Sequence, residues 1–167
     1  MVAPIVITIL AYLHIISAMG WLGGAALFVS VVGPGLRSLS LTARLEFLSK
    51  IGPGATRFFI GSSTATIVFG LALLFSFPGA SSATLTTGLA VGLIAYLDAI
   101  LVAIPSLRKA DHLAKEMLAS GQAGGQAGGP PSPELAKALK RGGIGVATVV
   151  VLLVITLISM VTAGFPF

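Results

Sequence analysis

The chain has 167 residues, of which 56% are hydrophobic and only 9% are charged, and its mean hydropathy is +1.05. A soluble globular domain carries roughly 25% charged residues, so this composition excludes a soluble domain and predicts an integral membrane protein. The net charge is +5, and the chain has no cysteine. Because the chain has no thiol, the sequence excludes disulfides, thiolate metal sites and iron–sulfur clusters.

Four apolar segments are long enough to cross a bilayer, whose hydrocarbon core is about 30 Å thick and takes about 20 helical residues to span. They comprise residues 5–32, 55–77, 87–104 and 143–163. In lipid, every backbone group must be hydrogen-bonded internally, which favours helices that pack together. We therefore predict an all-α fold, a polytopic membrane four-helix bundle formed by a single transmembrane domain over residues 1–167.

The ten Lys and Arg residues are distributed asymmetrically along the chain. All of them lie in or at the edge of two loops, around residues 34–54 and 106–142. By the positive-inside rule, both loops are cytoplasmic, so we predict a multi-pass protein of the cell membrane with both termini extracytoplasmic. The basic loops are expected to contact anionic lipid in the bilayer. They carry too few aromatic residues to indicate a nucleic-acid partner.

The first basic loop is bounded by Gly-Pro pairs and has apolar residues at Leu41, Leu45 and Leu48. This spacing is typical of one face of a helix. It predicts a short, ordered helix that lies in the membrane interface.

The second basic loop has three parts. Residues 106–119 are expected to continue the third helix into the cytoplasm, with His112 solvated. A Gly-rich repeat follows and predicts a flexible cytoplasmic linker over residues 120–133. Ser132, Pro133 and Glu134 then have the order of a helix cap, first position and first turn, so they predict a helix start.

Small residues recur at helix-packing spacing within the predicted spans. Such spacing lets two helices approach closely, and close packing is a commoner role for it than ligand contact. The pairs are Gly20 with Gly24, Gly61 with Ala65, and Gly88 with Gly92.

Two strongly polar side chains, His14 and Asp98, lie well inside the predicted spans. At about 1.5 Å per residue, both are expected roughly 15 Å from the outer end of their helices. A lone carboxylate is costly at that depth, so Asp98 is expected to be protonated or paired. We expect it to face the bundle interior beside His14, Tyr12 or Tyr96, where it would fix the tautomer of the imidazole.

Helical spacing places His14, Ser17 and Trp21 on one side of the first span. Two interpretations of His14 stay open. It donates a hydrogen bond to another helix inside the bundle, or its ring nitrogen binds a metal or a haem iron. The candidate cofactor-binding residues are therefore His14, Ser17, Trp21 and Asp98, with His14 as the candidate metal ligand.

The segment LHIISAMGWLGGAALFVSVVGPGL, residues 13–36, resembles the first helix of CopD-like and HemJ-like four-helix membrane proteins, in which His is followed by Trp and then by small residues. Residues 43–59, 69–75 and 104–117 are similar to the second helix of that group and to the segment after its third helix. The likeness therefore extends over most of the chain.

The resemblance implies haem b binding and protoporphyrinogen oxidation in the HemJ branch, and copper handling in the CopD branch. The one functional residue that the resemblance carries over is His14, which matches the first-helix His proposed as a haem ligand. The HemJ pattern also has a Lys in the third helix, where this chain has only Asp98, and this departure argues against HemJ-type oxidase activity. Copper would use His14 with Met19 or Met160, because Cu(I) accepts thioether ligands.

We therefore expect a CopD/HemJ-like membrane protein that binds haem b through His14 for membrane redox or haem and copper handling, with copper as the less favoured ligand. The alternative is a non-catalytic accessory subunit that binds no cofactor and packs in a larger membrane complex or a homo-oligomer. The residues show no nucleophile–base pair, and they leave open whether the chain is an enzyme.

Overall fold

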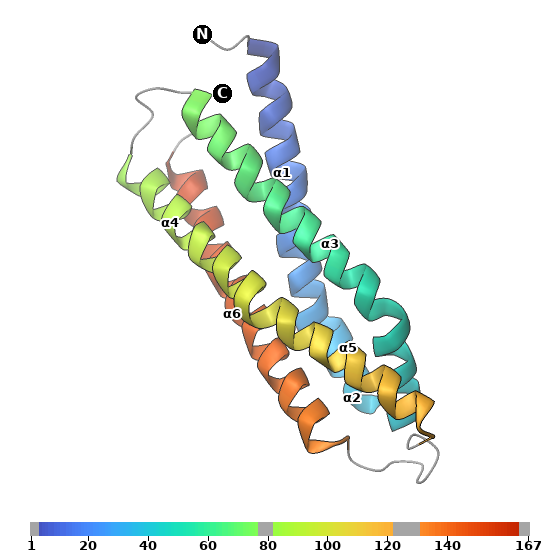
Figure 1. Cartoon of the computed structure of the whole chain (residues 1–167). Helices are drawn as coiled ribbons and strands as arrows, with labels where there is room; N and C mark the ends of the chain where they lie inside the picture. Colours follow the sequence, from blue (N-terminus) through green and yellow to red (C-terminus); the bar gives the residue numbers. More distant parts are fainter. Residues whose placement is uncertain (1–3, 77–81, 122–130, 164–167) are drawn as a thin grey trace.

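The computed structural model describes residues 4–76, 82–121 and 131–163. Four helical rods make up the fold (Figure 1). The first rod joins α1 (Pro4–Leu27), η1 (Phe28–Val32) and α2 (Gly33–Ser38), the second is α3 (Leu41–Ser76), the third joins α4 (Ala83–Asp98), η2 (Ala99–Ala103) and α5 (Ile104–Ala119), and the fourth is α6 (Pro133–Thr162).

All four rods are candidate membrane spans. They have 35, 36, 37 and 30 residues, and each contains a strongly apolar window. A span needs only about 20 residues, so each rod is long enough to cross the hydrocarbon core and project beyond it. The prediction of an all-α four-helix bundle is confirmed.

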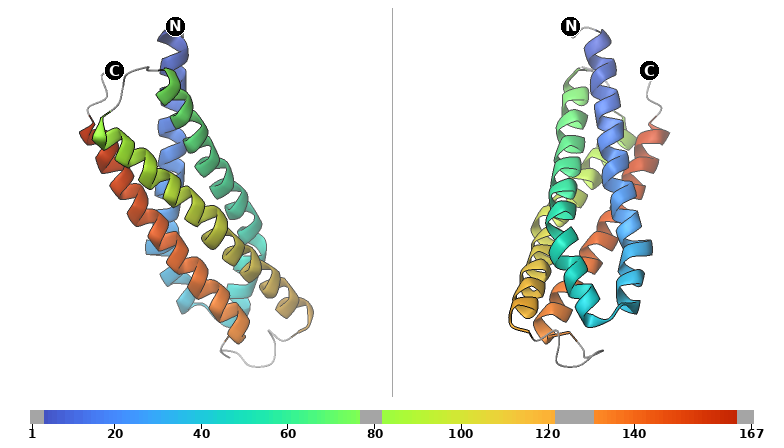
Figure 2. Two further views of the ribbon diagram at one scale, coloured as in Figure 1. Left: turned by 60° about the vertical axis from the view of Figure 1, so that its left-hand side comes forward. Right: turned by 90° about the vertical axis from the view of Figure 1, so that its right-hand side faces the viewer.

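The rods pack as two antiparallel pairs. α1 lies chiefly against α3, and α4 lies chiefly against α6, while α5 joins the pairs by contacting both α3 and α6. α3 and α4 make few contacts and diverge toward the end where α1 begins and α6 ends (Figure 2). We call this the terminal end. The opposite end is the basic end, and it carries Arg37, Arg108 and Lys140.

An internal repeat relates the two pairs. The shift in residue number that places the π-helix η1 on the π-helix η2 also places Pro34 on Pro105, Leu36 on Leu107 and Arg37 on Arg108. α3 and α6 correspond in the same way. The shift that places Leu45 on Leu135 also places the buried Thr56, Phe59 and Ser63 on the buried Val146, Val149 and Leu153. The two pairs therefore share their order of elements and have matching proline and core positions.

Each π-helix precedes a proline. The amide of Gly33 donates to the carbonyl of Phe28, and the amide of Ile104 donates to the carbonyl of Ala99, which is the wider π register. Proline has no N–H, and its ring clashes with the carbonyl one turn earlier in an α-helix. One wider turn before Pro34 and before Pro105 relieves that clash, so both rods continue through their prolines.

Two apolar clusters hold the pairs together. The larger lies in the middle of the bundle and includes Trp21, Phe59 and Val149. The smaller lies at the basic end, where α3, α5 and α6 meet around Leu45 and Leu135, both fully buried.

The smaller cluster corrects the interpretation of the first basic loop. Leu41 and Leu45 do not lie in a separate interfacial helix, since they form the first turns of α3 and are buried against α5 and α6. Pro53 lies inside α3 without ending it. The apolar spacing was that of a helix, but the partner is protein rather than the membrane interface.

The structure confirms the two predictions at either side of the linker. The third rod continues through α5 to Ala119, and His112 is exposed there, with Nδ1 3.3 Å from Glu116 Oε2. α6 begins with Ser132 as its cap, whose Oγ accepts from the amide of Leu135 at 3.2 Å. The predicted linker over residues 120–133 falls mostly on residues 122–130, which lie outside the described part of the chain.

The small-residue pairs divide into two kinds. A Cβ on Gly24 would lie 2.9 Å from Phe58 of α3, and one on Gly88 would lie 3.1 Å from Met160 of α6, so these glycines permit close helix packing as predicted. A Cβ on Gly61 would meet nothing within 4 Å. Gly61 therefore does not serve a contact within the described chain.

Candidate functional site

His14 lies on α1 and is bound to the neighbouring helix α3. Its Nδ1 is 2.9 Å from the backbone carbonyl oxygen of Thr66. A carbonyl oxygen only accepts hydrogen bonds, so Nδ1 carries the proton and donates it. In the neutral ring, Nε2 then has a free lone pair, and no hydrogen bond to Nε2 occurs in the described residues. The predicted bond from His14 to another helix is thus present, and the atom that would bind a metal is left free.

Gly70 makes room for the imidazole. A Cβ at this position would lie 2.8 Å from Cε1 and 3.1 Å from Nδ1 of His14, closer than a real side chain approaches. Gly70 is one helical turn after Thr66, so its missing side chain uncovers the Thr66 carbonyl toward α1. Thr66 and Gly70 together hold the ring in one orientation.

Ser17 and Trp21 have different surroundings from His14, although they share its side of α1. The hydroxyl of Ser17 donates to the carbonyls of Leu13 and His14, at 2.7 and 3.0 Å, so it is bonded within α1. Trp21 is only 2% exposed. Its ring packs edge-on against Tyr96 of α4, with 6.4 Å between the centroids.

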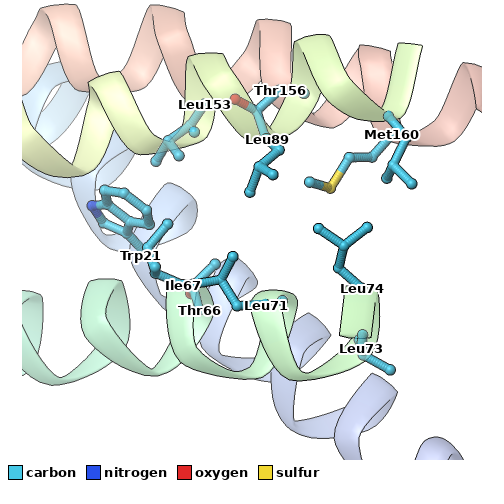
Figure 3. A pocket seen from close by; sticks show the side chains of 14 residues that line it. Trp21, Thr66, Ile67, Leu71, Leu73, Leu74, Leu89, Leu153, Thr156 and Met160 are labelled. Carbon is cyan, nitrogen blue, oxygen red and sulfur yellow. The ribbon is translucent and has the colours of Figure 1, made fainter. Parts of the chain in front are cut away.

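An apolar cavity of about 70 Å³ lies beside Trp21, between the two helix pairs (Figure 3). Residues from both repeats line it at equivalent positions, since Thr66 corresponds to Thr156 and Gly70 to Met160. In Figure 3, Leu71 and Leu74 of α3 point across it toward Leu89 and Met160. The cavity therefore lies where the two repeats meet.

The expected contact between Asp98 and His14 is not formed. Asp98 is the last residue of α4 and lines a separate groove with Thr148, Lys140 and Arg141 of α6, whereas His14 is held against α3. In the described chain, no hydrogen bond joins Asp98 to either predicted tyrosine. Tyr96 Oη is instead 3.1 Å from Thr64 Oγ1, and Tyr12 is 63% exposed. The depths of the two side chains counted from the sequence agree. However, α1 packs on α3 and α4 packs on α6, so the two side chains face different partners.

The carboxyl of Asp98 is poorly satisfied. Its Oδ2 is buried and has no hydrogen-bond partner in the described chain. An Asp at the centre of a membrane helix costs about 2.5–3.5 kcal/mol on insertion scales. None of the ion pairs within the described residues involves Asp98 to offset that cost.

The residues around His14 provide a single donor. In the described part of the chain, no group of three His, Cys, Asp or Glu side chains comes together. Met160 packs against Gly88 in the apolar cavity, and Met19 is 68% exposed. A haem iron needs only one proximal His, so haem b suits this donor set better than copper or zinc does. The cavity beside Trp21 is far smaller than the roughly 300–1,000 Å³ of ligand pockets, so it does not enclose a porphyrin.

The sequence did not reveal the residues that support the two polar side chains. Thr66 and Gly70 are spaced one helical turn apart. This spacing indicates an uncovered carbonyl only when α3 is already known to face His14. Thr148 and the cations of α6 come near Asp98 through the pairing of α4 with α6. Comparisons with family models, with curated proteins and with solved structures found no match to this chain.

Proposed function

We propose that this chain is a membrane protein of the CopD/HemJ-like type that binds haem b through Nε2 of His14. The observation that carries the proposal is the 2.9 Å contact between His14 Nδ1 and the Thr66 carbonyl. Metal-binding imidazoles usually donate their other ring N–H to such an acceptor, which fixes the tautomer and the direction of the lone pair.

Each residue has a defined role in this proposal. Nε2 of His14 would hold the haem iron, the Thr66 carbonyl orients the ring, and Gly70 leaves the space that the ring occupies. When bound, haem would supply one-electron redox chemistry. The part of the chain's own residues in this proposal is to hold and orient the group.

The visible absorption spectrum tests the proposal. Protein purified from cells supplied with haem is expected to show a Soret band, and His14→Ala is expected to lose it. His112→Ala is the matched control, because His112 is the other histidine and lies exposed on α5. A Soret band of equal intensity in the wild type and His14→Ala would exclude His14 as the ligand, and no band in either would exclude haem.

We also propose that the basic end is cytoplasmic and both termini are extracytoplasmic, with anionic lipid around the basic residues. The support is the positive-inside rule together with the fold, which gathers Arg37, Arg44, Arg108, Lys137 and Lys140 at one end.

A non-catalytic accessory subunit is the second candidate. Gly61 supports it, because this glycine is exposed on α3 and a Cβ there would meet nothing in the described chain. Exposed small residues let a helix of another subunit approach closely. If this candidate is correct, a partner co-purifies in mild detergent and Gly61→Leu releases it, whereas Gly143→Leu does not. A protein that migrates alone and monomeric would contradict it.

A further inference from the structure

Asp98 lies in a groove between the third rod and α6. The groove has a volume of about 250 Å³. Its apolar side is formed by Val102, Ile144 and Gly145. Its polar residues are Asp98 and Thr148 toward the middle of the bundle and Lys137, Lys140 and Arg141 toward the basic end.

The groove extends from the basic end to about the middle of the two candidate spans that form it. At about 1.5 Å per residue, Asp98 is about 22 Å along the rod from Ala83 at the terminal end. Thr148 is about 10 Å along α6 from Arg141 by the same measure. The groove therefore runs from the basic end into the apolar part of two candidate membrane spans.

The internal repeat shows that the polar groove belongs to one repeat only. The positions equivalent to Asp98 and Thr148 are Leu27 and Phe58. Those equivalent to Lys137 and Arg141 are Phe47 and Ile51, and only Lys140 has a polar counterpart, Lys50. Because the first repeat forms its helix pair with apolar side chains at four of these five positions, pairing of this kind does not require the polar side chains. Their gathering along one groove indicates a site.

Water meets the needs of this site better than any protein group does. The Oδ2 atom of Asp98 is buried without a partner, and no ion pair in the described chain reaches its carboxyl. A water molecule takes about 30 Å³, so the groove has room for several. Their hydrogen bonds would connect the Asp98 carboxyl with the solvent at the basic end.

The charges of the groove select what can enter. Lys137, Lys140 and Arg141 are exposed, and none has an ion-pair partner among the described residues. On α6, side chains tilt toward the helix N-terminus, so these three cations lean toward the basic surface and away from Asp98. They repel metal cations at the mouth, while Asp98 repels anions at the inner end. A proton has the same charge as a monovalent cation, but it moves between hydrogen-bonded water molecules without any ion crossing the groove.

We propose that the Asp98 groove is a hydrated inlet through which Asp98 exchanges a proton with the solvent at the basic end. The carboxylate takes a proton from hydronium to give a carboxylic acid and water, and returns it by the reverse step. This inference does not rest on haem binding at His14.

Cysteine labelling tests the water path, because the native chain has no cysteine. Thr148→Cys and Phe58→Cys occupy equivalent, exposed positions of the two repeats, and of the two only Thr148 lines the groove. In sealed vesicles, a membrane-impermeant sulfonate-bearing thiol reagent is expected to label Thr148→Cys from the side that labels Ser120→Cys, and from that side only. Only thiolates react, so Phe58→Cys in hydrocarbon is expected to react about tenfold more slowly for each unit by which its thiol pKa is raised.

The labelling experiments test two properties of the groove, its access to water and its selection by charge. Labelling of Thr148→Cys at the rate of Phe58→Cys, or from the opposite side, would overturn the inlet. A faster reaction with a trimethylammonium reagent than with the sulfonate would overturn the charge selection.

Infrared spectroscopy tests proton exchange itself. The carbonyl band of a protonated carboxyl is expected to change with the pH of the medium and to be absent in Asp98→Asn. Asp111→Asn is the control, since Asp111 lies on α5 and is paired with Lys115 at 2.9 Å. A band that is unaffected by Asp98→Asn would assign the proton elsewhere.

Discussion

Trp21→Ala is expected to lower the free energy of unfolding by about 2–3 kcal/mol. Trp21 is 2% exposed and belongs to the central cluster, where it joins α1 to Tyr96 of α4. Truncation of a buried Trp costs about 3–5 kcal/mol in soluble proteins, and part of that cost is transfer from water, which is absent between helices in lipid. The energetic cost of the cavity and of the lost aromatic contact remains.

Detergent or thermal unfolding followed by circular dichroism measures this loss. Met19→Ala is the matched control, because Met19 is on the same helix and 68% exposed, and it is expected to change stability by less than about 0.5 kcal/mol. Equal losses in the two variants would mean that Trp21 is not in the packed centre of the bundle.

Gly145→Val is expected to destabilise the protein by about 1–3 kcal/mol, the usual cost of overpacking a core. A Cβ on Gly145 would lie 3.1 Å from Cβ of Ala103, 3.2 Å from its Cα and 3.3 Å from its backbone nitrogen. Backbone atoms of η2 cannot rotate away as a flexible side chain does. The added side chain must therefore move α6 away from the third rod.

Gly143→Val separates this effect from the general consequences of replacing a helical glycine. Gly143 lies on α6, is exposed, and would meet nothing within 4 Å. We expect this variant to unfold at the wild-type midpoint or slightly above it, since glycine is a poor helix former. Two variants with the same midpoint would show that α6 does not pack closely on η2.

Composition and hydropathy predict most of the fold, because a helix in lipid is recognised by its length and apolar content alone. The start of α6 was also predictable, since Ser132, Pro133 and Glu134 act through local backbone bonds. The first turns of α3 were not. Leu41 and Leu45 have the spacing of an apolar helix face, and this spacing does not say whether lipid or another helix covers the face.

The site was predictable only in part, for a related reason. The depth of His14 and Asp98 follows from counting residues, but their partners depend on which helices pack together. α1 packs on α3, so His14 meets Thr66 and Gly70. α4 packs on α6, so Asp98 lies near Thr148 and the basic residues of α6. The equal predicted depths of His14 and Asp98 favoured a contact between them, and the pairing of the helices prevents it.

Chemical rescue tests most directly whether the imidazole at position 14 holds iron. His14→Gly is expected to lose the Soret band, and added imidazole is expected to restore it by occupying the space that the side chain leaves beside Gly70. His14→Leu fills that space and is expected to stay without the band at the same imidazole concentration. A Soret band at the wild-type level in His14→Gly without imidazole would contradict haem ligation by His14.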